Sequence, residues 1–371
     1  MAITILHDIL QAGVTAQASD WHIREGRPVG LRVDGSLVET DFVAKREFIE
    51  KALSEIMPPL FLEGFDRTGD VDFAFMEDGI GRFRVNLHRQ RGLFSLSLRY
   101  VKNKVPPYNE LGLPEVVLHI AETQRGIIFV TGATGSGKST TLASMIEHVN
   151  AHFGLHIITI EDPIEYTFED AKSIIEQREV GLDCSTFESA LEHVLRQDPD
   201  VIVIGEMRSR STFEVALAAS ETGHLVMSTL HTTNAPQTIM RILDMFPHQE
   251  REAIRRSLGA NLNSLICQRL VPRAAGRGII PAVEVMVNTP IVSKLITENR
   301  LEKLPSAIES GADDGMISFN RSLLTLVNDG IITEQAALEA SNNPQALQMN
   351  LNGIFLSTDG GSLIGSGPAG G

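Results

Sequence analysis

Hydrophobic and polar residues alternate through much of the first hundred residues, which is typical of strands with one buried face. The alternation over residues 29–33 is followed by an Asp-Gly pair at 34–35 and resumes at Leu37. Asp-Gly suits a tight two-residue turn, so these residues predict a β-hairpin. A helical spacing follows over residues 48–57. We therefore predict a small α+β domain over residues 1–100.

Two later strands of this domain carry arginines on their polar faces. In residues 82–88 every second residue is apolar, and Arg84 lies between two apolar positions. In residues 94–99 the same alternation places Arg99 among the polar positions. Because side chains alternate between the faces of a strand, pairing of these strands would put several cations on one face. An arginine on an exposed strand face can also be merely solvated.

The pattern changes after residues 101–115, which contain three prolines and one glycine with little periodicity and which we interpret as a linker. From residue 116 to 290, short apolar runs alternate with helical spacings. The runs are typical of parallel strands that are buried on both faces. Alternating strands and helices predict a doubly wound α/β domain. The apolar runs lie at residues 127–130, 157–160, 201–204 and 225–227.

Beyond residue 290 the chain becomes helical again, and we predict a helical C-terminal region over residues 291–352. Residues 353–371 are rich in Gly and Ser and bury too little apolar surface to fold, so we predict a disordered tail.

The composition is that of a globular protein, with 43% hydrophobic and 21% charged residues. We find neither an apolar run of about 18 residues nor a basic segment followed by an apolar one, so we expect a cytoplasmic protein without a signal peptide. Cys184 and Cys267 are far apart and are expected to be reduced. The net charge of −15 opposes binding to a polyanion, which argues against a helicase or recombinase.

The sequence GATGSGKST at residues 132–140 is the strongest chemical signal in the chain. It follows a predicted strand and precedes a predicted helix, which is the context of a phosphate-binding P-loop. Backbone amides of such a loop surround the β-phosphate, the lysine reaches the β- and γ-phosphates, and the serine hydroxyl can bind Mg²⁺. The predicted nucleotide-binding residues are Gly132, Ala133, Thr134, Gly135, Ser136, Gly137, Lys138, Ser139 and Thr140.

Carboxylates follow two of the predicted strands, at the sheet edge where doubly wound domains bind ligands. Glu161, Asp162 and Glu165 follow one strand, and Glu206 follows another in a pattern that resembles a Walker B element. Such groups can hold Mg²⁺ or activate water. A solvated acidic turn is the alternative for the first set, and an exposed glutamate is the alternative for Glu206.

His224 and His231 bracket the predicted strand 225–230. Metal binding is not expected, because no further ligands lie at the spacing of a metal site. From spacing alone, a structural role is the simpler interpretation of both histidines.

Four motifs, in this order and spacing, resemble the Walker A, Asp, Walker B and His boxes of secretion-type ATPases: GATGSGKST, TIEDPIEY, VIVIGEMR and ETGHLVMSTLHT. ASDWH at residues 18–22 and GRFRVN at 81–86 extend the resemblance to the retraction ATPases of bacterial type IV pili, the PilT/PilU family. The resemblance covers nearly the whole chain. It implies a PAS-like N-terminal domain, a RecA-like core and a homohexamer that hydrolyses ATP with Mg²⁺.

The resemblance also implies roles for individual residues. Glu165 would be the catalytic base and Glu206 the Walker B acid, and with Ser139 they would hold Mg²⁺. Arg84 and Arg99 would reach the γ-phosphate, while His224 and His231 would report the nucleotide state. The implied partners are an inner-membrane platform protein, at the inner face of the cytoplasmic membrane, and a paralogous retraction ATPase. No nucleic acid is expected.

Extension-type relatives usually carry a four-cysteine zinc element and a long additional N-terminal domain, and this sequence has neither, which favours the retraction type. Two positions depart from the family pattern. Ser209 stands where the family has aspartate, and residues 290–293 lack the family's Ala-Ile-Arg signature. Trp21 stands where a leucine is usual, and we expect a packing role. The alternative function is an accessory subunit with weak turnover that works with a catalytic paralogue.

Overall fold

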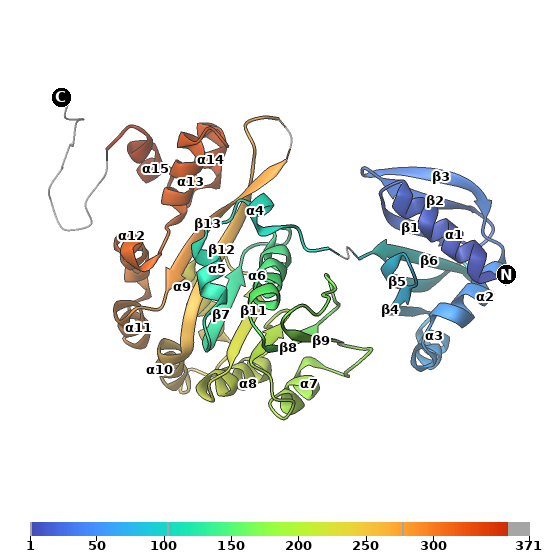
Figure 1. Ribbon diagram of the computed structural model, residues 1–371, viewed down its shortest axis with the longest axis horizontal. Coiled ribbons are helices and arrows are strands. Elements are labelled where there is room, and N and C mark those ends of the chain that lie inside the picture. Colours follow the sequence, from blue (N-terminus) through green and yellow to red (C-terminus); the bar gives the residue numbers. More distant parts are fainter. Residues whose placement is uncertain (1, 102–103, 277, 355–371) are drawn as a thin grey trace. The chain divides into compact units, whose positions relative to one another are not determined.

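The computed structural model describes residues 2–101, 104–276 and 278–354, whose contacts form two compact units (Figure 1). The first unit comprises residues 1–104 together with 163–168 and 181–185. The second comprises residues 105–162, 169–180 and the described residues from 186 onwards. Within the described residues, no helix is both long enough and apolar enough to cross a bilayer.

The first unit is a six-stranded antiparallel sheet with three α-helices, in the strand order β3-β2-β1-β6-β5-β4. The predicted hairpin is confirmed as β2 and β3, and the predicted helix as α2. The sequence pattern did not predict α1, β1 or α3. The elements are α1 Ala2–Thr15, β1 Ala18–Arg24, β2 Pro28–Val33, β3 Ser36–Val43, α2 Arg46–Ile56, α3 Leu62–Thr68, β4 Asp70–Glu77, β5 Gly81–Gln90 and β6 Leu93–Tyr100.

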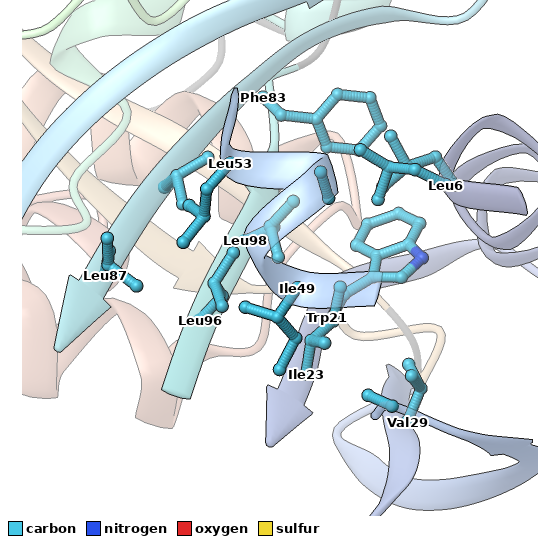
Figure 2. Packing of buried hydrophobic residues seen from close by; sticks show 14 of the residues in the cluster. Leu6, Trp21, Ile23, Val29, Ile49, Leu53, Phe83, Leu87, Leu96 and Leu98 are labelled. Atoms are coloured by element: carbon cyan, nitrogen blue, oxygen red, sulfur yellow. The ribbon is translucent and has the colours of Figure 1, made fainter. Parts of the chain in front are cut away.

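A single hydrophobic core joins the sheet to α1 and α2, and Trp21 lies inside it (Figure 2). The indole is fully buried, packs edge-on against Phe83 with ring centroids 5.3 Å apart, and donates from Nε1 to the Ile9 carbonyl at 3.1 Å. A buried indole N–H needs such an acceptor. The expected packing role of Trp21 is confirmed.

The second unit is a seven-stranded sheet in the order β13-β12-β7-β11-β10-β8-β9. All neighbouring strands are parallel except β12 and β13. Every residue of β7, β10 and β11 is buried, so both faces of the central sheet are covered, as the apolar runs predicted. The strands are β7 Gly126–Thr131, β8 His156–Glu161, β9 Ile174–Glu179, β10 Val201–Ile204, β11 Leu225–Leu230, β12 Leu262–Pro272 and β13 Ile279–Val287.

Helices connect these strands, and α6 and α8 both pack on β7 and β11. In α6 an apolar stripe of Leu142, Met145, Ile146 and Val149 is buried. The segment interpreted as a linker contains the one-turn α4, where the Tyr108 hydroxyl donates to the Pro114 carbonyl at 2.7 Å. The helices are α4 Tyr108–Leu111, α5 Val116–Ala121, α6 Lys138–His152, α7 Phe187–Val194, α8 Arg210–Glu221, α9 Ala235–Asp244 and α10 Arg251–Asn261.

The C-terminal region is helical, as predicted, and part of it packs on the sheet edge formed by β12 and β13. Leu323, Leu326 and Leu347 share a buried cluster with Val271 and Ile280 of these strands. Most of the predicted tail, residues 355–371, lies outside the described residues. The helices are α11 Pro290–Thr297, α12 Leu304–Ser310, α13 Phe319–Asn328, α14 Glu334–Ala340 and α15 Pro344–Leu351.

Candidate functional site

The GATGSGKST segment forms the turn between β7 and α6, as its context predicted. Gly135 and Gly137 have φ of +78° and +88°, a conformation that residues with a Cβ rarely adopt. Ala133, Thr134 and Gly135 are exposed at the tip of the loop, whereas Ser136 is buried. The loop therefore presents backbone at the amino end of α6, where the helix dipole favours an anion.

Lys138, the first residue of α6, is buried and folds its side chain back onto the loop. Its Nζ donates to the carbonyls of Gly132 and Ala133, both at 3.0 Å. These carbonyls hold the ammonium group at the mouth of the loop, next to the region where a phosphate would bind.

A polar chain runs from Lys138 through His231 to Glu206. Nζ of Lys138 lies 3.5 Å from His231 Nδ1, and His231 Nε2 lies 3.0 Å from Glu206 Oε1. An ammonium group only donates, so Nδ1 accepts and the proton on Nε2 points to the carboxylate. Adjacent parallel strands explain the contact, since Glu206 and His231 follow β10 and β11 at the same sheet edge. These two predicted residues are thus brought together with the P-loop lysine.

Glu206 also accepts a 2.6 Å hydrogen bond from Arg208. Partial burial is the largest single influence on the pKa of Glu206 and would raise it. The hydrogen bond from Arg208 and the nearby His231 outweigh burial and hold the pKa below its usual value. Glu206 is therefore ionised at neutral pH.

Arg84, Arg99 and Glu165 line one small pocket of the first unit, with a volume of about 200 Å³. Arg84 and Arg99 are direct cross-strand partners on β5 and β6, as the strand alternation predicted. Nη2 of Arg84 donates to the carbonyls of Pro163 and Ile164 at 3.3 and 3.2 Å and lies 3.8 Å from the Glu165 carboxylate. Three of the six predicted catalytic side chains therefore share this pocket.

Asp20 orients Arg99 from the neighbouring strand β1. Its Oδ1 accepts from Arg99 Nε at 2.7 Å, and its Oδ2 accepts from the Ser19 hydroxyl at 2.7 Å. Burial would raise the pKa of Asp20, but the bonds from Ser19 and Arg99 outweigh it and lower that pKa. The ion pair is formed through Nε of Arg99. The sequence contained Asp20 in its ASDWH motif but gave no indication of this contact.

His224 is not brought to the P-loop. It lies at the amino end of β11, and the P-loop lies beyond the carboxyl end of the adjacent β7, which is a separation of roughly 20 Å along the strands. Its Nδ1 lies 3.0 Å from the Ala219 carbonyl and 3.1 Å from the Thr222 hydroxyl. The role suggested for His224 stays a prediction.

Two oxygen groups of the second unit are of the kind that binds Mg²⁺. The Ser139 hydroxyl lies in the first turn of α6, and the second unit also provides the ionised Glu206. Glu165 belongs to the first unit, so the three proposed metal residues do not form one site within either unit. No cluster of three His, Cys, Asp or Glu side chains suited to a metal occurs in the described part of the chain. Glu161 is instead bound to Thr159 and Gln177, at 2.7 and 3.2 Å.

The departure at Ser209 has a structural explanation. Ser209 caps α8, and its hydroxyl accepts from Thr212 N–H at 3.2 Å. Serine and aspartate are both good N-caps. The serine hydroxyl also donates to Glu188 Oε1 at 2.8 Å, which a carboxylate could not do.

Residues 84–304 match the family described as Type II/IV secretion system protein. The chain is 39% identical over 339 residues to the type IV pilus retraction ATPase PilT of Pseudomonas aeruginosa, covering 91% of this chain and 98% of that protein. It is 38% identical over 342 residues to the type IV pilus ATPase PilU of the same organism, covering 92% and 90%.

A solved structure, described as the pilus retraction motor PilT and bound ADP, has the same fold, with a TM-score of 0.85 and 42% identity. The similarity covers 92% of this chain and 98% of that one. Both described units are therefore included in the comparison.

Proposed function

The chain belongs to the Type II/IV secretion system protein family, and from that premise we propose that it is the ATP-driven motor that retracts a type IV pilus. It is an ATPase with a RecA-like core, and it binds nucleotide. Retraction is supported by the similarity to PilT over almost the full length of both chains.

The observation that carries the proposal is the chain of contacts from Lys138 through His231 to Glu206. Loop amides would bind the phosphates, and Lys138 would turn from the loop carbonyls towards the β- and γ-phosphates. That movement would weaken the contact of Lys138 with His231. His231 would then report the presence of the γ-phosphate to Glu206, which polarises the attacking water.

The first unit would supply the remaining groups. We propose that Arg84 and Arg99 stabilise charge on the γ-phosphate and that Glu165 orients or deprotonates water. Glu165, Ser139 and Glu206 are the residues that would hold Mg²⁺. When bound, the metal supplies positive charge that neutralises the phosphate oxygens. Loss of the γ-phosphate would remove the arginine contacts and so change the orientation of the domains.

The assembly and its partners are also part of the proposal. We propose a homohexamer that acts on an inner-membrane platform protein, at the inner face of the cytoplasmic membrane. A paralogous retraction ATPase is a further proposed partner. Nucleic acid is not a proposed substrate, because a net charge of −15 opposes binding to a polyanion.

A second candidate is an accessory subunit that binds ATP and turns it over weakly. The similarity to PilU, at 38% identity against 39% for PilT, favours neither relative. Lys138, Glu165 and Glu206 are all present and argue for an active enzyme.

Magnesium-dependent ATPase activity of the purified chain separates the two candidates. Replacing Glu206 with Gln should lower kcat by at least about 100-fold, the usual effect of losing a group that activates the nucleophile. Glu214→Gln is the matched control, because Glu214 also forms a 2.7 Å pair with an arginine but lies on α8. The assembly state is measured alongside.

Robust turnover that only Glu206→Gln abolishes supports an autonomous motor. A wild type that assembles and binds ATP but hardly hydrolyses it would favour the accessory subunit instead.

A further inference from the structure

Strand β12 lies next to the P-loop and brings Gln268 into contact with it. β12 pairs in parallel with β7, with Cys267 opposite Thr131, so Gln268 comes level with the first residue of the loop. The Gln268 side chain is almost fully buried, with 3% of the residue exposed. Burying an amide is unfavourable unless both of its ends form hydrogen bonds.

Both ends of the Gln268 amide are bonded to the segment that carries the P-loop lysine. Nε2 donates to the Ser136 carbonyl at 2.7 Å, and Oε1 accepts from the Thr141 hydroxyl at 2.7 Å. The opposite orientation would set Oε1 against the Ser136 carbonyl, so only one orientation of the amide is compatible with the site. Gln268 thus joins the loop before Lys138 to the helix after it.

Strand β12 at Gln268 also limits the space at two of the three glycines of the motif. A Cβ at Gly132 would lie 2.3 Å from the Ser136 hydroxyl and 2.5 Å from the backbone carbonyl oxygen of Gln268, and a Cβ at Gly137 would lie 2.7 Å from the side-chain Nε2 of Gln268. At Gly135, by contrast, no atom lies within 4 Å of such a Cβ. Gly132 and Gly137 therefore give the loop room to lie against Gln268, in addition to their backbone conformation.

The hydrogen bond to Ser136 also sets the direction of a loop amide. In a planar trans peptide the C=O and the following N–H point in opposite directions. With the Ser136 carbonyl directed at Gln268, the N–H of Gly137 must point away from Gln268.

We propose that Gln268 is a positioning residue of the nucleotide site, which holds the P-loop so that its amides and Lys138 face the phosphates. The proposal rests on the nucleotide site described above. A side chain needed only for packing would be apolar at this position, because Met or Leu fills similar space without a desolvated amide. Thr141 takes part by fixing the orientation of the amide.

The test compares the affinity for a fluorescent ADP analogue with thermal unfolding of the nucleotide-free protein. Gln268→Met keeps the volume and removes both hydrogen bonds, so the Kd should rise by about tenfold or more, as expected for loss of roughly one good hydrogen bond. The unfolding midpoint should change little. Thr141→Val should weaken binding less, and adding it to Gln268→Met should have no further effect, because both act through one amide.

The Gln268→Glu variant tests the proposal through the pH dependence of its affinity for ADP, which would not change if Gln268 only filled space. Its carboxylate repels the Ser136 carbonyl, but its protonated form can donate to that carbonyl as the amide does. Affinity should therefore be poor at about pH 8 and recover towards about pH 5.5, because a buried carboxyl group regains its proton in this range. Wild type measured over the same range controls for other titrating groups.

A Gln268→Met variant that binds ADP as tightly as wild type would overturn the proposal, and so would Gln268→Glu with a pH profile parallel to that of wild type. A wild type that binds ADP tightly yet hydrolyses no ATP would contradict the proposed motor and leave the role of Gln268 intact.

Discussion

Gly13 and Trp21 have complementary shapes in the core of the first unit. A Cβ at Gly13 would lie 2.4 Å from three atoms of the Trp21 indole. Glycine inside a helix is less favourable than alanine by about 1 kcal/mol, so its presence in α1 requires a packing reason. The indole that lies against α1 provides that reason (Figure 2).

Gly13→Ala should therefore destabilise the protein, by about 1 to 3 kcal/mol, the usual range for overpacking a core. Chemical denaturation measures the effect. Gly64→Ala is the control, because Gly64 lies in α3 with no atom within 4 Å of an added Cβ and should gain up to about 1 kcal/mol. Gly13→Ala combined with Trp21→Leu should lose less than the sum of the two single changes. Equal effects of Gly13→Ala and Gly64→Ala would contradict this account.

Glu284 is a buried carboxyl group in the second unit. Burial is the main cause of its raised pKa, and the acceptor bond to Ala235 N–H, together with Cys267 and Arg269, only partly opposes it, while Glu309 adds to the rise. The folded protein therefore holds this proton above the ordinary pKa of 4.5, where the unfolded chain releases it.

Stability contributed by Glu284 should be complete below about pH 4.5 and should decline as the pH rises through the folded pKa. The Glu284→Gln variant has no group that titrates at this position, so its free energy of unfolding should lack the decline that Glu284 causes. The measurement is the free energy of unfolding of both proteins across this range. Parallel curves for the two proteins would contradict the predicted ionisation.

At the scale of single elements, the N-cap of α8 shows how one side chain can have two structural roles. Ser209 both caps the helix and donates to Glu188, and the pKa of Glu188 is lowered by its own backbone N–H first and by the hydroxyls of Ser209 and Ser211 next. Aspartate, which the family resemblance led us to expect at this position, would serve only the first of these two roles.

Ser209→Ala should cost about 1 kcal/mol, the usual value of an N-cap. Ser209→Asp should keep the cap but place two carboxylates together, so it should be less stable than wild type at neutral pH and regain stability when acid protonates one of them. Thr333→Asp, at the equivalent cap of α14, is the comparison. Thermal unfolding at neutral and acid pH measures these differences in stability. A Ser209→Asp protein as stable as wild type at neutral pH would contradict the role of Glu188.

Elements with a regular apolar pattern could be predicted from the sequence, and those set by long-range pairing could not. β7, β10 and β11 are central strands, so each appears as an uninterrupted apolar run. β12 was missed because it interrupts its apolar residues with Gln268 and Arg269, whose partners lie far away in the chain.

Some residues of the candidate site could be found from the sequence, and others could not. The motifs identified Lys138 and Glu206, because the chemistry of each follows from its residue type and its place after a strand, whereas a functional role for His231 was implied only by the family resemblance. Gln268 and Asp20 could not be found from the sequence, since their partners lie 132 and 79 residues away along the chain. Only the pairing of β12 with β7, and of β1 with β6, brings them into contact.

At the scale of the whole molecule, the six predicted catalytic side chains divide equally between the two units. Arg84, Arg99 and Glu165 belong to the first, and Glu206, His224 and His231 belong to the second. The similarity to PilT extends over both units, so the comparison supports the function of the whole chain rather than of its P-loop domain alone.

Retraction in the native host tests the central claim most directly. The gene for this chain is deleted, and surface pili and surface motility are measured before and after complementation with wild type or Lys138→Ala. We predict that the deletion leaves excess surface pili and abolishes motility, and that only wild type restores both. Unchanged pili and motility after deletion, or full restoration by Lys138→Ala, would contradict an ATP-driven retraction motor.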